Sequence, residues 1–229
     1  MMSFSKAVEI PGLAGIELDI QLTKDGEIVV IHDERVDRTT NGIGYVKDFT
    51  YHQIRNLEID AGNGRQEKIP SIEEVLDLLE SRMKQGLFLN IELKNSNIQY
   101  AGMEDKILRI IAKRGLEEYV VYSSFYTKSL VELKELEPGA SVGILDMKVS
   151  DCYYKKKGTM ENTQAALHPF WKGMDLTKER LRGQTVRAWF LGHLYPEPPT
   201  GTRLNIERLE DKGITDIFLN EPEAYLISD

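Results

Sequence analysis

The sequence predicts an α/β fold, specifically a TIM-type (β/α)8 barrel, and three observations support this prediction. Short apolar segments of strand character alternate with amphipathic helical segments along the chain, which is the pattern of βαβ units in a parallel sheet. At 229 residues, an α/β barrel forms a single domain. Charged residues make up 29% of the chain, as in ordinary globular domains. We therefore expect one barrel domain over residues 1–229.

The expected elements follow one another with recognisable start and stop signals. A helix over residues 2–10 ends at a Pro-Gly pair, and Ser71 with Glu74 forms the capping box of another helix. A run of three lysines before Gly158 predicts a solvated loop. In order, we expect a helix at 2–10, a hairpin at 15–32, a polar segment at 33–68, a helix from 71, a strand at 87–93, a helix at 102–113, a strand at 119–123, a helix at 127–136, a strand at 141–145, a loop at 146–161, a helix within 162–170, a short helix at 177–181, a strand at 185–191, a loop at 193–202, a helix at 203–212 and a strand at 214–219.

The first predicted strand has an unusual polar face. Residues 15–22 alternate, so that four aliphatic side chains share one face and Glu17, Asp19 and Gln21 share the other. One interpretation is an antiparallel surface strand whose polar face meets water. The other is a cleft in which Glu17 and Asp19 hold a hard cation, because carboxylate oxygens suit Mg²⁺ or Ca²⁺.

Two further segments favour the second interpretation. A tight turn containing Asp25 and Gly26 leads into an apolar run that ends in His32 and Asp33. A separate strand at 87–93 also alternates, with Glu92 and Lys94 on its polar face. An imidazole, several carboxylates and an ammonium group at strand ends suit metal-assisted acid/base chemistry.

The composition narrows the class of protein. The net charge of −8 argues against a nucleic-acid-binding protein, which would show a basic stripe. The single cysteine, Cys152, fits a reducing compartment, so we expect a cytoplasmic protein. The sequence shows neither a signal peptide nor an apolar run long enough to span a membrane. It leaves the oligomeric state open, a homo-oligomer included.

Five segments occur in a characteristic order and spacing. They are GIELDI at 15–20, TKDGEIVVIHD at 23–33, DRTTNG at 37–42, IPSIEEVL at 69–76 and NIELK at 90–94. Together they resemble the glycerophosphodiester phosphodiesterase family, and a weaker similarity continues through 123–125, 167–169, 186–189 and 213–222. The resemblance thus covers nearly the whole chain.

This resemblance implies a function and a set of roles. The expected reaction is metal-dependent hydrolysis of small glycerophosphodiesters to glycerol 3-phosphate and an alcohol, a reaction of lipid and glycerol metabolism. It implies that Glu17, Asp19 and Glu92 hold Mg²⁺ or Ca²⁺, that His32 is a catalytic acid/base residue, and that Lys94 is catalytic and contacts the phosphate. It also implies that Phe125 and Trp189 line the substrate pocket, although each is equally well explained as barrel core.

The resemblance also implies a gap and leaves alternatives open. Family members begin with a strand carrying a His-Arg-Gly motif, whereas this sequence begins at the helix that follows, so we expect a barrel lacking its first strand and weak activity. His168 has no expected role as a substitute. We expect the 33–68 segment to be an insertion over the active-site mouth after the second strand, with Tyr45, Phe49, Tyr51 and Leu57 as its core. The alternatives are a catalytically inactive metal- and phosphate-binding protein, or a related barrel phosphodiesterase for choline- or sphingosine-containing lipids.

Overall fold

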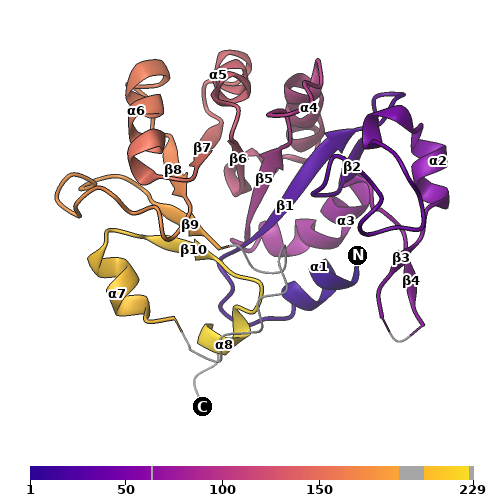
Figure 1. Cartoon of the computed structure of the whole chain (residues 1–229), viewed down its shortest axis with the longest axis horizontal. Coiled ribbons are helices and arrows are strands. Elements are labelled where there is room, and N and C mark those ends of the chain that lie inside the picture. Colours follow the sequence, from indigo (N-terminus) through magenta and orange to yellow (C-terminus); the bar gives the residue numbers. More distant parts are fainter. Residues whose placement is uncertain (63, 191–203, 227–229) are drawn as a thin grey trace. The chain divides into compact units, whose positions relative to one another are not determined.

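The computed structural model describes residues 1–62, 64–190 and 204–226 of the chain (Figure 1). The chain divides into two compact units, Met1–Ala140 and Ser141–Asp229. The predicted loop at 193–202, with His193, lies outside the described residues, as do residue 191 of one expected strand and residue 203 of one expected helix. The organisation of 1–229 as a single domain stays a prediction.

The first unit alternates strands and helices after a short opening helix. Its elements are α1 (Met2–Ala7), β1 (Gly15–Leu22), β2 (Ile28–Val30), the 3-10 helix η1 (Val46–Asp48), α2 (Tyr51–Asn56), β3 (Ile59–Asp60), β4 (Gln66–Glu67), α3 (Ile72–Met83), β5 (Phe88–Leu93), α4 (Met103–Arg114), the 3-10 helix η2 (Glu117–Tyr119), β6 (Val120–Ser124) and α5 (Thr127–Leu136). The expected hairpin and the five helices and strands expected between residues 71 and 136 are confirmed to within a few residues. The first helix is shorter than expected and has no buried residue.

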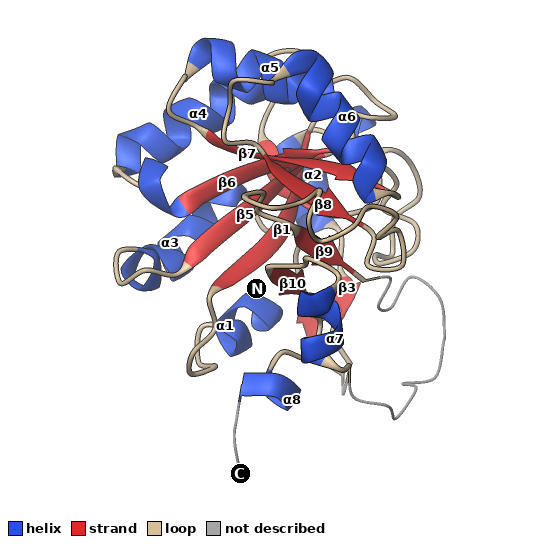
Figure 2. Ribbon diagram, turned by 90° about the vertical axis from the view of Figure 1, so that its left-hand side faces the viewer, coloured by secondary structure: helices blue, strands red, loops and turns tan. Residues whose placement is uncertain are grey.

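The strands of this unit form a mostly parallel sheet in the order β2, β1, β5, β6. β5 is parallel to both β1 and β6, while β2 is antiparallel to β1 as the hairpin requires. The aliphatic side chains of β1 and β5 are buried, and α3, α4 and α5 lie along one side of these strands (Figure 2). Because side chains alternate along a strand, the polar side chains of β1 and β5 project from the opposite face of the sheet.

The capping box expected at Ser71 and Glu74 is confirmed. The Ser71 hydroxyl accepts a hydrogen bond from the Glu74 N–H at 3.2 Å, and the Glu74 carboxylate accepts one from the Ser71 N–H at 2.9 Å. This is the expected capping box, which satisfies two otherwise unpaired N–H groups. At the end of α4, Gly115 takes up the left-handed conformation with φ of 65°, which glycine adopts without steric cost.

The 33–68 segment has a small core, although its composition differs from the prediction. Its fully buried side chains are those of Val36, Val46 and Ile54, which cluster with Val29, Ile31 and Ile69. Phe49, Tyr51 and Leu57 pack against this cluster, as expected. The inclusion of Tyr45 was wrong: its ring is 40% exposed and Arg35 lies over it at 4.7 Å from the centroid. Lys47 also lies over this ring, at 5.7 Å from the centroid, so Tyr45 packs against cations and not in the apolar cluster.

The second unit contains parallel strand pairs. Its described elements are β7 (Ser141–Asp146), α6 (Val149–Thr159), β8 (Ala166–Pro169), β9 (Arg187–Trp189), α7 (Ile206–Asp211), β10 (Asp216–Phe218) and α8 (Glu223–Leu226). β7 pairs with β8 and β9 pairs with β10, both in parallel. Single parallel bridges, such as Phe170 to Trp189, connect the β8 region to β9. The parallel βαβ pattern expected from the sequence is therefore confirmed in this unit.

The prediction of a solvated loop at 146–161 was wrong, because α6 occupies most of this segment. Lys157 is exposed, but the other two lysines have partners. The Lys155 ammonium pairs with Asp146 at 2.6 Å, and the Lys156 ammonium donates to the carbonyl of Ala165 at 2.7 Å and to the Gln184 amide oxygen at 2.8 Å. The helix buries only Val149 and Cys152, so its apolar stripe is too sparse to read from the sequence.

Two further predictions in this unit were wrong. The helix expected within 162–170 is instead strand β8, whose pairing with β7 overrides a short and ambiguous apolar run. The short helix expected at 177–181 is a series of turns. One helical bond forms there, from the Leu181 N–H to the Thr177 carbonyl at 3.2 Å, and Gly183 with φ of 77° leaves the helical region two residues later.

Candidate active site

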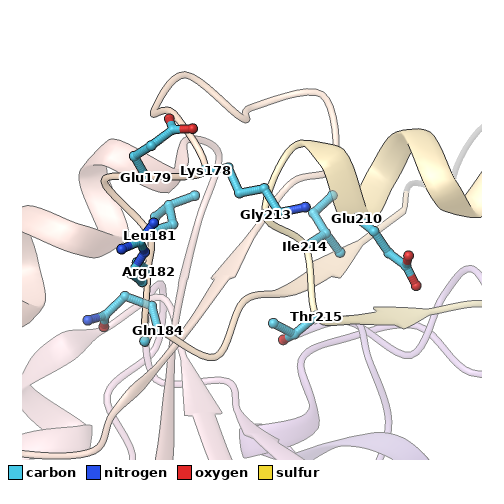
Figure 3. A pocket seen from close by; sticks show the side chains of 10 residues that line it. Lys178, Glu179, Leu181, Arg182, Gln184, Glu210, Gly213, Ile214 and Thr215 are labelled. Atoms are coloured by element: carbon cyan, nitrogen blue, oxygen red, sulfur yellow. The ribbon is translucent and has the colours of Figure 1, made fainter.

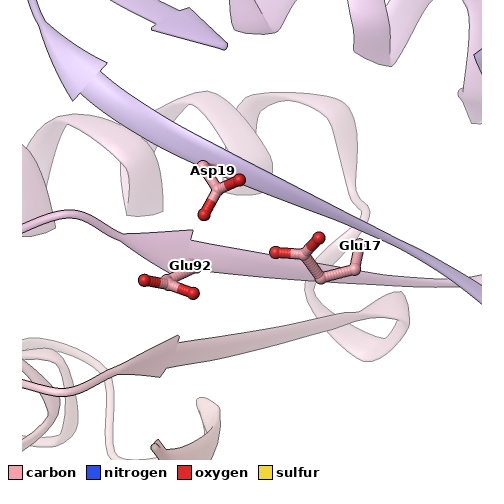
Figure 4. Close-up of side chains that lie close together, drawn as sticks. All are labelled: Glu17, Asp19 and Glu92. Carbon is pink, nitrogen blue, oxygen red and sulfur yellow. The ribbon is translucent and has the colours of Figure 1, made fainter. Parts of the chain in front are cut away.

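Strand register brings three carboxylates together in the first unit. β1 and β5 are paired so that Asp19 lies beside Glu92, and Glu17, two residues earlier, lies beside Asn90. Carboxylate oxygens of Glu17, Asp19 and Glu92 all lie within 4.8 Å of one another. Figure 4 shows the three groups facing each other from the two strands. The structure thus brings together the three residues expected to bind a metal.

The electrostatics of this cluster disfavour three negative charges without a counter-ion. Desolvation, with repulsion from Asp19, raises the pKa of Glu92 to about 7, although Lys94 opposes the shift. The pKa of Glu17 is also raised, because surrounding protein desolvates it and because Asp19 and Glu92 are like charges. By surface area, however, Glu17 is the exposed member of the cluster. An added cation would relieve this repulsion and return both pKa values toward their ordinary range.

Lys94 is the cation that the chain itself supplies to the cluster. Its ammonium nitrogen lies 2.7 Å from Oε1 of Glu92 and 3.0 Å from Oδ1 of Asp19. The three side chains are 11–13% exposed, so water screens these pairs only weakly. The two carboxylates raise the pKa of Lys94 above its ordinary value despite its desolvation. An ammonium group has three N–H donors, so one remains for a further acceptor.

The residues present fit a hard divalent cation. All three candidate ligands are carboxylates, the donors that Mg²⁺ and Ca²⁺ prefer. Oδ1 of Asp19 is buried, and among the described residues the Lys94 ammonium at 3.0 Å is the partner given to it. Next to Glu17 in the register, the amide oxygen of Asn90 is also buried and has no donor among these residues, while its NH₂ group binds the Ser123 hydroxyl at 2.8 Å. Asn90 had no assigned role in the sequence analysis.

His32 lies on the loop that leaves β2, and its ring is held by a carboxylate. Nδ1 of His32 lies 2.8 Å from Oδ1 of Asp33. Arg38 donates to both oxygens of Asp33, at 2.6 and 3.0 Å. These bonds, that of Arg38 above all, lower the pKa of Asp33, so it stays ionised and accepts the Nδ1–H of His32. The Nε2 atom of His32 is then available for proton transfer.

The role of Asp33 and Arg38 was missed in the sequence analysis. Asp33 was noted only as part of a cluster of polar groups, and Arg38 only as part of the DRTTNG segment. The signal that could have found them is the carboxylate next to a candidate acid/base histidine, since such a partner fixes the ring tautomer. The five-residue spacing to Arg38 carries no comparable signal.

The two expected pocket residues lie in different units. Phe125 directly follows β6 in the first unit and is partly buried. Trp189 is the last residue of β9 in the second unit, where its indole N–H donates to the carbonyl of His168 at 3.1 Å and its ring lies 4.9 Å from that of Phe170. These contacts account for the position of Trp189 without a ligand.

His168 is a core residue of the second unit. Its side chain is fully buried on β8, against Gly143, where any larger residue would collide with the imidazole ring. Desolvation, with a smaller effect from Arg187, lowers its pKa to about 3. A histidine in such surroundings stays neutral at physiological pH, which agrees with the absence of an assigned role.

A shallow groove in the second unit lies away from the carboxyl ends of its strands. It is lined by residues 178–184 and 210–215, and Figure 3 shows these two segments facing each other. Residues 184 and 215 come shortly before β9 and directly before β10, so the groove lies at the amino ends of these strands. Active sites of parallel barrels form at the carboxyl ends. We assign this groove no role in catalysis.

Comparisons with known proteins identify the class. The model of the glycerophosphoryl diester phosphodiesterase family matches residues 1–194. A glycerophosphodiester phosphodiesterase of Caldanaerobacter subterraneus subsp. tengcongensis is 35% identical over 98% of this chain and 88% of its own. One from Bacillus altitudinis is 40% identical over 97% of this chain and 89% of its own.

A solved structure shares the fold. The glycerophosphodiester phosphodiesterase of Parabacteroides distasonis aligns with a TM-score of 0.72 at 24% sequence identity, covering 97% of this chain and 86% of that one. The fold is a TIM barrel, and the family match together with the named relatives defines the class, a phosphoric diester hydrolase. The chain belongs to the glycerophosphoryl diester phosphodiesterase family. It is therefore an enzyme of the glycerophosphodiester phosphodiesterase type.

Proposed function

We propose that the reaction depends on a divalent cation, Mg²⁺ or Ca²⁺, held by Glu17, Asp19 and Glu92, and that it releases glycerol 3-phosphate and an alcohol. The observation that supports this proposal best is the close approach of three carboxylates on register-paired strands. A bound cation would neutralise phosphate charge and polarise the phosphorus–oxygen bonds. The raised pKa values of Glu17 and Glu92 indicate a site that is electrostatically incomplete without such a charge.

The chain's own residues account for the remaining chemistry. Water adds to phosphorus while the bond from phosphorus to the alcohol oxygen breaks, so one proton must leave the water and one must reach the alcohol. His32 would exchange one of these protons through Nε2, since Asp33 accepts the hydrogen at Nδ1. Lys94, with its remaining N–H, would donate to a phosphate oxygen beside Asp19 and Glu92.

The substrate pocket and its surroundings complete the proposal. Phe125 would contact the glycerol side from the end of β6, and the same role for Trp189, in the second unit, stays a prediction from the family resemblance. The 33–68 insertion would border the mouth of the site, because Arg38 within it holds Asp33 next to His32. The part of the chain that the structure describes contains no helix able to cross a membrane, and we propose a cytoplasmic location on the single cysteine, Cys152.

The test is hydrolysis of glycerophosphocholine by the purified chain, with the products identified by enzymatic or mass-spectrometric assay. We expect glycerol 3-phosphate and choline to appear with Mg²⁺ or Ca²⁺, to stop on chelation and to resume when the cation is restored. Turnover that a chelator leaves unchanged would overturn the metal dependence. A folded chain that binds the cation but hydrolyses no glycerophosphodiester would indicate a binding role, and hydrolysis of lysolipids instead would indicate a lipid-directed enzyme.

A further inference from the structure

The third polar residue of β1 makes contacts that the proposed chemistry does not use. Gln21 follows Glu17 and Asp19 on the same strand face, and its side chain is fully buried. Its Nε2 atom lies 3.0 Å from the carbonyl oxygen of Ile31, 3.2 Å from that of His32 and 2.6 Å from that of Asp33. One buried amide thus faces three consecutive carbonyls of the segment that carries His32.

The orientation of this amide is fixed from its other end. Oε1 of Gln21 accepts a hydrogen bond from the hydroxyl of Tyr100 at 2.9 Å. Because backbone carbonyls only accept hydrogen bonds, the NH₂ group must face them, and the tyrosine hydroxyl then donates to the amide oxygen. Tyr100 is itself buried, and its backbone N–H donates to Oδ1 of Asn95 at 2.9 Å. The segment between β5 and α4 therefore holds the amide of Gln21 in place.

Apart from Gln21, the His32 segment is held by the buried side chain of Ile31, which packs in the cluster with Val29, and by the bonds of Arg38 to Asp33. β2 ends at Val30, so the three carbonyls lie beyond the strand ladder. The Ile31 N–H donates to the carbonyl of Asp19 at 3.1 Å, which ties the segment to the strand that bears the carboxylates. The His32 side chain is 45% exposed, so packing does little to fix it. Its position depends on the backbone beneath it and on Asp33.

We propose that Gln21 is a positioning residue that holds His32 at a fixed distance from the carboxylate cluster, and that Tyr100 acts through Gln21. This inference rests on the proposed function, in which His32 transfers a proton. Gln21 touches neither substrate nor cation in this account. It acts by fixing the peptide groups of residues 31–33, because displacement of a catalytic group by about 1 Å lowers the rate steeply.

Two variants test this inference in the full chain. Gln21→Met removes the donors with little change of volume, and Tyr100→Phe removes only the hydroxyl. We expect kcat on glycerophosphocholine to fall by about 10- to 100-fold in Gln21→Met, while KM and the affinity for the activating cation change by less than about twofold. Tyr100→Phe should cause a smaller loss, and the double variant should lose no more than Gln21→Met alone, since both act through one amide. Tyr122→Phe, a buried tyrosine on β6, is the matched control and should behave as wild type.

Hydrogen exchange supplies a readout that does not need turnover. Amides in a peptide covering 28–36 should exchange faster in Gln21→Met and Tyr100→Phe than in wild type or Tyr122→Phe. If the wild-type chain hydrolyses no glycerophosphodiester, the proposed function fails, and exchange alone then decides whether Gln21 holds the segment. Unchanged exchange and unchanged kcat in Gln21→Met would overturn the inference. A parallel loss of kcat, cation affinity and melting temperature would also overturn it, because that result indicates a general structural role.

Discussion

Asp19 and Glu92 occupy paired positions on adjacent parallel strands, so their carboxylates leave the sheet on the same face and at the same level. Lys94 lies two residues after Glu92, and its ammonium group contacts both carboxylates. With Glu17 two residues before Asp19 on β1, this pairing produces a three-carboxylate cluster in which desolvation and like charge raise the pKa of Glu17 and Glu92. The pairing of two strands thus creates the proposed metal centre.

Removing one carboxylate should abolish cation binding at this centre. In Asp19→Asn we expect the affinity for Mg²⁺ or Ca²⁺ to fall by more than the about 10- to 100-fold seen when an outer-shell partner is lost, with activity falling in parallel. Isothermal titration calorimetry and the glycerophosphocholine assay measure the two effects. Glu118→Gln, which changes an exposed carboxylate in the same unit, is the control. Wild-type affinity in Asp19→Asn would contradict this assignment.

Cation binding should release protons. Because the pKa of Glu92 is about 7 in the metal-free chain, part of the population holds a proton there at neutral pH that a bound cation must displace. Apparent affinity should therefore rise as pH increases from about 5 to about 7. Calorimetry in two buffers of different ionisation enthalpy counts the released protons. An affinity that does not change with pH over this window would contradict the prediction.

The same shift makes the stability of the metal-free chain depend on pH. The folded state keeps a proton on Glu92 up to about pH 7, whereas the unfolded state releases it near 4.5. The folded chain thus binds more protons between these values, so the free energy of unfolding should decrease as pH rises through this window. Added cation should reduce the decrease. Urea denaturation at several pH values, with and without Mg²⁺, measures both slopes, with Glu92→Gln as the comparison. If the free energy of unfolding of the metal-free wild type rose with pH over this window relative to Glu92→Gln, the result would be inconsistent with this account.

His32 should matter for proton transfer and little for cation binding. In His32→Asn we expect kcat to fall by about 100- to 10,000-fold, the usual contribution of a positioned acid/base group. Asp33→Asn should cause a smaller loss, because the ring loses the carboxylate that accepts its Nδ1 hydrogen. His52→Asn changes an exposed histidine in α2 and serves as the control. Equal kcat values for His32→Asn and His52→Asn would exclude His32 as the acid/base residue.

Lys94 should be important for both stability and activity. In Lys94→Met the carboxylates of Asp19 and Glu92 lose their partner, which we expect to lower the free energy of unfolding of the metal-free chain by about 3 kcal/mol near pH 8. The effect should shrink near pH 5, where Glu92 is protonated. Lys128→Met, at an exposed position of α5, is the control. The activity of Lys94→Met at saturating Mg²⁺ should remain low, because the phosphate loses a hydrogen-bond donor. Wild-type activity of this variant would exclude a role of Lys94 in the active site.

Much of this site follows from the sequence because strand geometry is simple. A period of two assigns Glu17 and Asp19 to one face, and Glu92 and Lys94 to one face of another strand, whatever the rest of the fold. What the sequence cannot supply is the packing of loops. The bonds from Gln21 to the carbonyls of residues 31–33 depend on how the hairpin bends after β2, and those from Arg38 to Asp33 depend on the folded insertion.

The errors in the predicted secondary structure have a related cause. α6 buries too few residues to show a helical stripe, and its lysines bind partners from later segments such as Ala165 and Gln184. β8 has only four residues, and its strand character comes from pairing with β7. In both cases contacts between distant parts of the chain decide the structure, and local propensity does not report them.

The central claim is that Glu17, Asp19 and Glu92 hold the divalent cation on which hydrolysis depends. The most direct test is a crystal structure of the chain grown with Mn²⁺, which oxygen-rich sites accept in place of Mg²⁺ and which gives an anomalous signal. This account predicts an anomalous peak about 2.0 to 2.6 Å from oxygens of all three carboxylates. A cation bound elsewhere, or none between these side chains in a protein whose activity requires the metal, would contradict it.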